Sequence, residues 1–89
     1  MKINFEKFPL YKGIDKSEVE VLNAKRVFAE ELYTKGQGVA FHALALKIYN
    51  SNGEEEYSDE EYSLMIAFSE HMMTPNFIDS LKALKKDRF

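Results

Sequence analysis

The chain has 89 residues, no cysteine and a formal net charge of −3. This length allows one domain and not two, and the lack of cysteine excludes disulfides and thiolate metal sites. A hydrophobic content of 45% argues against a disordered chain, and the acidic balance excludes an overall positive field that would attract nucleic acid. We predict a single domain at 1–89, in which 1–22 form an arm and 23–89 a helical body.

The arm has the residue alternation of strands. Ile3 and Phe5 stand between polar residues, and the two valines of 18–22 alternate with glutamates in the same way. Turn-forming residues separate the two stretches. We predict a short antiparallel hairpin with one strand within 2–12 and the other within 18–22. An irregular arm draped over the helices is the alternative.

The first helix is predicted to begin at Asn23, whose side-chain oxygen can accept a hydrogen bond from an amide of the first turn. Apolar residues then recur at spacings of three and four. The helix is expected to end near Thr34 and Lys35, because Gly36 can adopt the left-handed conformation that commonly terminates helices.

The segment from Val39 to Tyr49 is apolar on nearly every side, and its alanine and leucine content favours helix. A helix without a broad polar face belongs in the centre of a domain or at an interface. We predict that it is the central helix. Because a domain of this size has little chain with which to cover such a helix on every side, we also expect homodimerisation to complete its burial.

Two further helices have clear starts. Ser58 and Glu61 form the pattern of a capping box, and Thr74 followed by Pro75 is typical of a helix start. The predicted fold class is therefore α+β and mainly α, with a short N-terminal β-hairpin packed on a four-helix array.

The sequence contains no recognisable motif for a catalytic, metal or cofactor site. His42 and His71 belong to no metal-binding pair, and we interpret His42 as a buried, hydrogen-bonded side chain. Gly36-Gln37-Gly38 lacks the lysine and third glycine of a phosphate-binding loop, so we interpret it as a hinge. We predict that the protein is not an enzyme and uses no cofactor. An enzyme would need a pocket that holds one of the two histidines against a carboxylate.

Six carboxylates fall within residues 54–61. A calcium loop built around Gly53 is disfavoured, because its first position would be Ile48, which has no side-chain oxygen, and its last would be Asp59 in place of glutamate. We interpret the run as a solvated helix start and an acidic loop. A surface that meets a basic patch on a partner is the alternative.

Two sets of side chains are candidates for contacts with a partner. Apolar side chains of the predicted helices are expected to contact a protein partner or a second copy, although their spacing is also typical of a core: Phe41, Leu44, Tyr49, Met72 and Met73. The alternative is a small regulator that contacts nucleic acid through basic residues near the C-terminus: Lys82, Lys85, Lys86 and Arg88. Nucleic acid is the less favoured partner, because compensation of the helix dipole accounts equally well for these charges.

Three stretches of the chain resemble small proteins carried by prophages and related mobile elements. They are Leu44-Ala45-Leu46-Lys47-Ile48-Tyr49 with the following Asn52-Gly53, then Tyr57-Ser58-Asp59-Glu60-Glu61, and Thr74-Pro75-Asn76-Phe77-Ile78. In those proteins a helix that ends in an aromatic residue is followed by a glycine turn and an acidic capping box. The resemblance implies a phage-encoded assembly, adaptor or regulatory protein, and it implies no site residues.

The function predicted from these features is a non-enzymatic protein-interaction module that forms a homodimer or binds a protein partner. The first residues lack the unbroken apolar run of a secretory signal, and no apolar stretch is long enough to cross a bilayer. We therefore expect a cytoplasmic protein with no membrane contact.

Overall fold

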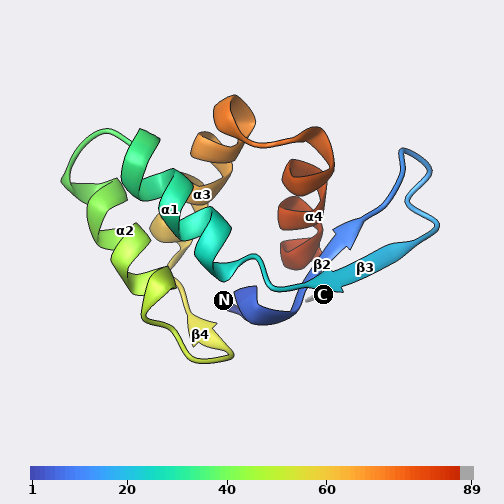
Figure 1. The fold of residues 1–89 in the computed structure, drawn as a ribbon, viewed down its shortest axis with the longest axis horizontal. Coiled ribbons are helices and arrows are strands. Elements are labelled where there is room, and N and C mark those ends of the chain that lie inside the picture. Colours follow the sequence, from blue (N-terminus) through green and yellow to red (C-terminus); the bar gives the residue numbers. More distant parts are fainter. Residues whose placement is uncertain (87–89) are drawn as a thin grey trace.

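The computed structural model describes residues 1–86 of the chain, with side chains through Lys85. Its elements follow in the order β1 (Lys2–Ile3), the 3-10 turn η1 (Phe5–Lys7), β2 (Phe8–Tyr11), β3 (Val19–Leu22), α1 (Lys25–Lys35), α2 (Val39–Tyr49), β4 (Glu55–Glu56), α3 (Asp59–Met72) and α4 (Pro75–Lys86). The predicted fold class is confirmed: the protein is α+β and mainly α, with a short N-terminal hairpin beside four helices (Figure 1).

The hairpin of the arm lies where the alternation predicted it. Strands β2 and β3 pair antiparallel, with Phe8 opposite Leu22 and Tyr11 opposite Val19. Strand β2 packs along α4, which supplies the support that a two-stranded ribbon needs. The alternative of an irregular arm is therefore excluded.

A second strand pairing was not predicted. Strand β1 pairs antiparallel with β4, which is Glu55–Glu56 of the acidic run. The Met1 ammonium group lies 2.6 Å from the Glu56 carboxylate and donates to the Tyr57 carbonyl at 2.7 Å. The interpretation of the whole run as a solvated helix start and loop is therefore wrong at these two residues. Strands of two residues are too short to show periodicity, and their partner lies far away in the sequence.

The core is centred on an aromatic cluster around Phe28 of α1. Its fully buried ring has centroid distances of 5.4 Å to Phe5, 5.0 Å to Phe77 and 6.3 Å to Phe68. Phe5 lies in η1 and not in a strand, which corrects the reading of its alternation with Ile3. The cluster joins η1, α1, α3 and α4, so α1 is the helix at the centre of the domain.

The prediction that the helix at Val39–Tyr49 is central is wrong, although its bounds are confirmed. In Figure 1, α2 lies at one end of the long axis of the molecule and the β2–β3 ribbon lies at the other. The helix packs mainly against α1, with Leu44 and Ile48 buried. Val39 is 84% exposed and Leu46 is 43% exposed, so its outer side is uncovered. The composition identified an apolar helix, but it did not show how many neighbours the helix has.

The caps explain why neighbouring helices begin and end where they do. The predicted capping box is confirmed: Glu61 N–H donates to Ser58 Oγ at 3.1 Å, and Ser58 N–H donates to the Glu61 carboxylate at 2.8 Å. The predicted left-handed Gly36 is wrong, because its φ is −72° and its backbone is extended. Glycine is needed there for a close approach, since a Cβ would lie 2.5 Å from the Leu32 carbonyl oxygen and 2.8 Å from Phe41 Cβ.

Candidate interaction surface

The exposed side of the α1–α2 pair carries an apolar surface. A hollow of about 230 Å³ lies between the two helices. We define the α1/α2 face by the residues that line this hollow: Ala29, Glu30, Tyr33, Ala45, Leu46 and Tyr49. The two tyrosines and the leucine stand out from it, with Tyr33 58%, Leu46 43% and Tyr49 51% exposed. The face therefore presents large apolar groups to solvent around a floor of alanines.

Helical spacing explains how the sequence builds this face. Leu46 and Tyr49 lie three residues apart on α2, and Ala29 and Tyr33 lie four apart on α1, so each pair shares one side of its helix. The buried alanines Ala29 and Ala45 are small enough to let the two helix backbones approach closely. The tyrosine and leucine side chains consequently frame a hollow instead of filling it.

The rim of the face carries both charge signs. Arg26 Nε donates to Glu30 Oε1 at 3.1 Å along one side of α1. This hydrogen bond and the nearby carboxylate charge raise the pKa of the Arg26 guanidinium above its ordinary value. Exposed pairs of this kind contribute little to stability, so both groups remain available for contacts outside the chain.

The structure separates the five apolar candidates. Tyr49 belongs to the α1/α2 face. Phe41 and Met72 line a different hollow of about 380 Å³ beside the α1–α2 loop, where the Phe41 ring lies 5.8 Å from Phe68. Leu44 is only 2% exposed and lies in the core, so its assignment as a contact residue is wrong. Met73 is half-buried against the core.

Sequence reasoning missed Tyr33 and Leu46 as exposed apolar residues. Leu46 was read only as part of an apolar central helix and was not named as a contact residue, and Tyr33 was not singled out. The available signal was the spacing that places Leu46 with Tyr49 on one side of α2. That signal does not say which side faces the solvent, because both sides of this helix are apolar.

The two histidines lie on the surface, at different places in the fold. His42 is exposed, which corrects its interpretation as a buried side chain, and its ring centroid lies 5.5 Å from that of Tyr33. His71 is also exposed and lines the hollow that contains Phe41. Within the part of the chain that the structure describes, no three histidine or carboxylate side chains come close enough together to hold a metal ion.

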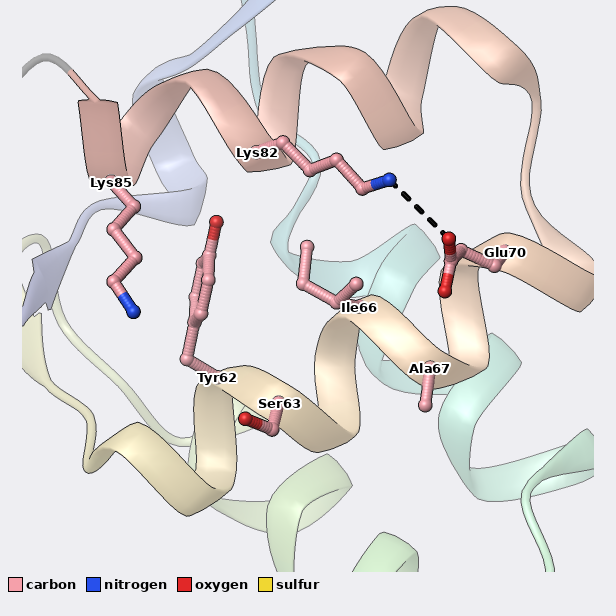
Figure 2. Close-up of a pocket in the computed structure, with 7 residues that line it drawn as sticks. All are labelled: Tyr62, Ser63, Ile66, Ala67, Glu70, Lys82 and Lys85. Atoms are coloured by element: carbon pink, nitrogen blue, oxygen red, sulfur yellow. Dashed lines mark hydrogen bonds and ion pairs between the residues drawn. The ribbon is translucent and has the colours of Figure 1, made fainter.

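Lys82 and Lys85 of α4 border a groove between α3 and α4 with a volume of about 550 Å³ (Figure 2). Lys82 Nζ lies 3.3 Å from Glu70 Oε2, and Lys85 Nζ lies 5.7 Å from the centre of the Tyr62 ring. Tyr62 donates its hydroxyl to the Leu81 carbonyl at 2.7 Å, and burial raises its pKa. Both lysines therefore contact groups of their own chain.

The other two basic candidates are Lys86 and Arg88. The Lys86 side chain and the whole of Arg88 fall outside the described residues. Within residues 1–85 the groove thus presents two cations, one of which already has a carboxylate partner. A nucleic-acid contact would have to compete with that ion pair for Lys82.

Two carboxylates, those of Glu61 and Glu6, bind groups of the connection between α2 and α3. Burial raises the pKa of Glu61, but hydrogen bonds from Ser58 and the Lys47 ammonium at 2.9 Å lower it more, so the pKa lies below its usual value. Glu6 accepts from the Gly53 N–H at 2.6 Å and pairs with Lys25 at 3.4 Å, and these contacts lower its pKa. These contacts give Glu61 and Glu6 structural roles.

No helix within residues 1–86 has both the length and the apolar character needed to cross a membrane. No family model matches the chain, and no match was found among curated proteins or among solved structures.

Proposed function

We propose that this protein is a non-enzymatic interaction module that forms a homodimer through its α1/α2 face. The observation that carries the proposal is the exposure of Tyr33, Leu46 and Tyr49 around one hollow. Removing such apolar area from water is favourable, and tyrosine is enriched among the residues that dominate binding energy at interfaces. A partner surface that covers this hollow would complete the burial of α2.

Charge supports a second copy as the partner. A two-fold interface brings the same patch of each subunit together, so it must be complementary to itself. The rim meets this condition, because it carries Arg26 and Glu30 side by side. A two-fold axis through the hollow would allow Arg26 of each copy to meet Glu30 of the other, while the apolar groups pack at the centre.

The biological setting is proposed from the resemblance of Leu44–Tyr49 and the later turn and capping segments to prophage and mobile-element proteins. It favours an assembly or adaptor role for the dimer, in the cytoplasm. A small regulator that contacts nucleic acid through Lys82 and Lys85 remains the alternative. The contact of Lys82 with Glu70 argues for the dimer over this alternative.

Sedimentation velocity over micromolar to millimolar concentrations tests the proposal. We expect the unmodified chain to shift from monomer to dimer, and Leu46→Glu to weaken the dimer at least tenfold, because it places a charge in the apolar centre. Ile14→Glu is the matched control: Ile14 is 98% exposed in the turn of the β2–β3 ribbon, at the opposite end of the molecule. This variant should dimerise as the unmodified chain does.

Three outcomes would contradict the proposal. The first is an unmodified chain that stays monomeric up to millimolar concentration. The second is equal dimerisation of the Leu46→Glu and Ile14→Glu variants, which would place the interface elsewhere. The third is salt-sensitive retention of the monomer on DNA, since binding to phosphates weakens steeply as salt rises and would support the nucleic-acid alternative.

A further inference from the structure

The β2–β3 ribbon has two outer edges, and its register shows which backbone groups lie on each. The Lys12 N–H donates to the Glu18 carbonyl at 3.0 Å, so these opposed residues form a hydrogen-bonded pair. Antiparallel ladders alternate between hydrogen-bonded and non-hydrogen-bonded pairs. The non-hydrogen-bonded pairs are therefore Tyr11 with Val19 and Pro9 with Val21. The backbone groups of these four residues point away from the opposite strand.

The outer edge of β2 is closed by α4. The Tyr11 N–H donates to Ser80 Oγ at 2.9 Å, and the Tyr11 carbonyl accepts from Asn76 Nδ2 at 3.0 Å. Pro9, the other residue on this edge, has no N–H to offer. Side chains of α4 thus take the place that a further strand would occupy.

The outer edge of β3 is open. Val19 is 49% exposed and Val21 is 62% exposed, and their outward N–H and C=O groups have no partner within residues 1–85. Alternate residues of a strand lie about 6.8 Å apart, so the two donors and two acceptors have the repeat that another strand requires. In Figure 1, β2 lies between β3 and α4, which leaves β3 on the outside. Exposed edges of this kind template strand addition.

We infer that the open edge of β3 binds an extended, basic segment of another protein by strand addition. Glu18, which immediately precedes β3, and Glu20 within it alternate with the two valines. Glu18 already lies 3.5 Å from Lys12, whereas Glu20 has no ion-pair partner within residues 1–85. A lysine or arginine of the added strand would lie directly opposite Glu20 and form a cross-strand pair. This inference does not depend on the α1/α2 face.

Charge disfavours a second copy of β3 as the added strand. A two-fold antiparallel pairing that uses the outward groups of both valines sets Val19 of each copy opposite Val21 of the other. Glu20 is then opposite Glu20 of the second copy in a non-hydrogen-bonded pair, where Cα atoms are about 4.5 Å apart. Like charges directly opposite each other destabilise a sheet. The same glutamate that repels a second copy attracts a basic strand.

The probe for the test is a short synthetic peptide in which lysine and valine alternate, with a matched peptide in which glutamate replaces lysine. Binding is measured by isothermal titration at low salt, and amide hydrogen exchange is followed at Val19 and Val21. We expect the lysine peptide to bind at least tenfold more tightly than the glutamate peptide. It should also slow exchange of the two outward amides by tenfold or more.

Two variants separate backbone pairing from general charge attraction. Val21→Pro removes an outward N–H that the β2–β3 ladder does not use, and proline is tolerated on edge strands with that geometry. It should weaken binding of the lysine peptide at least tenfold, whereas the matched Val21→Thr variant, which retains the N–H, should not. Glu20→Lys reverses the charge without altering the backbone and should reverse the preference between the peptides.

The inference is overturned if the lysine peptide does not bind, or if the Glu20→Lys variant keeps the original preference. Equal binding by the proline and threonine variants would also overturn it, because the contact would then not use the strand edge. A dimer of the unmodified chain that Val21→Pro abolishes would identify a second copy as the occupant instead. The Leu46→Glu variant should bind the lysine peptide as tightly as the unmodified chain does. Loss of the dimer and loss of peptide binding can therefore be observed separately, and each contradicts only its own proposal.

Discussion

At the helical end of the molecule, the uncovered surface of interest is made of apolar side chains, whereas the ribbon end also exposes the backbone groups of a strand edge. Tyr33, Leu46 and Tyr49 protrude around a hollow. The backbone N–H groups of the residues that line it are hydrogen-bonded within the helices α1 and α2. Within residues 1–85 the outward N–H and C=O groups of Val19 and Val21 have no hydrogen-bond partner. The first surface suits a partner matched in shape, and the second suits any extended chain with complementary charges. Small size leaves the domain with both, because little chain remains to cover its ends.

The largest expected effect on stability comes from a substitution in the aromatic cluster around Phe28, which contacts elements at both ends of the molecule. Phe28→Ala should lower the free energy of unfolding by about 3–5 kcal/mol, because it removes a buried ring and leaves a cavity. Since small domains have marginal stability, this loss should loosen the ribbon and the helical end together. Urea unfolding followed by circular dichroism measures it. The same substitution at the half-buried Phe41 is the control and should cost clearly less.

If Phe28→Ala left the ribbon intact while the helices unfolded, the two ends would be independent units. Hydrogen exchange at Tyr11 and at Ile48 reports on each end separately. Equal loss of protection at both sites is the expected result.

A pair of glycine substitutions sharpens the comparison between the ends. Gly36→Ala should destabilise the protein by about 1–3 kcal/mol, because its Cβ would lie 2.8 Å from Phe41 Cβ and 2.5 Å from the Leu32 carbonyl oxygen. Gly13→Ala, in the turn of the ribbon, should stay within about 0.5 kcal/mol of the unmodified protein. Its Cβ would approach nothing closer than 3.5 Å. Thermal unfolding of the two variants measures the difference in stability. Equal destabilisation by the two substitutions would show that the α1–α2 junction can accommodate a Cβ at residue 36.

The smallest expected effect is a dependence on acid pH. The pKa of Glu61 is lowered in the folded protein, so its ionised form stabilises the fold at pH values above the ordinary 4.5. That contribution should disappear as pH falls below 4.5 through the lowered pKa. In the Glu61→Gln variant the free energy of unfolding should decrease less steeply as pH falls. Glutamine keeps the capping bond to Ser58 but loses the charge that binds Lys47.

Asp15→Asn is the matched change at the ribbon end. Hydrogen bonds from the Ser17 amide and hydroxyl lower the pKa of Asp15, but this group lies in an exposed turn. Asparagine can accept the same bonds, so this variant should retain most of the acid dependence. If Asp15→Asn flattened the profile as much as Glu61→Gln, the acid-sensitive contacts would lie in the ribbon and not in the α2–α3 connection.

Local signals in the sequence were sufficient for most of the elements. The Ser58–Glu61 capping box, the bounds of the helix at Val39–Tyr49 and the pairing of 2–12 with 18–22 each depend on residues close together in the chain. Features that join distant residues were missed. Strand β4 exists only because β1 lies beside it. Gly36 is needed because a Cβ there would crowd both the Leu32 carbonyl oxygen and Phe41 Cβ, and the second contact arises only when α2 packs beside α1.

The candidate surfaces show the same division. Tyr49 and Leu44 were both contact candidates from the sequence, but Tyr49 is exposed, whereas Leu44, on another side of the same helix, is buried. An apolar helix gives no sequence signal for which side meets its neighbour, so Leu46 and Tyr33 could be recognised only after α2 was found beside α1. For the ribbon, the alternation at 18–22 predicted a strand, but it did not show which of the two edges would remain open.

The sequence by itself determined the fold class, the helices, the capping box of α3, the hairpin, and the presence of more apolar helix than a small domain can readily enclose. These depend on periodicity and on hydrogen bonds between near neighbours, which a single stretch of chain contains. The tertiary structure alone decided that α1 and not α2 is central, that α4 closes one edge of the ribbon, and that residues 1–85 leave the outer edge of β3 and the outer side of α2 uncovered. Those outcomes depend on which elements compete for the same neighbours, and no local pattern records that competition.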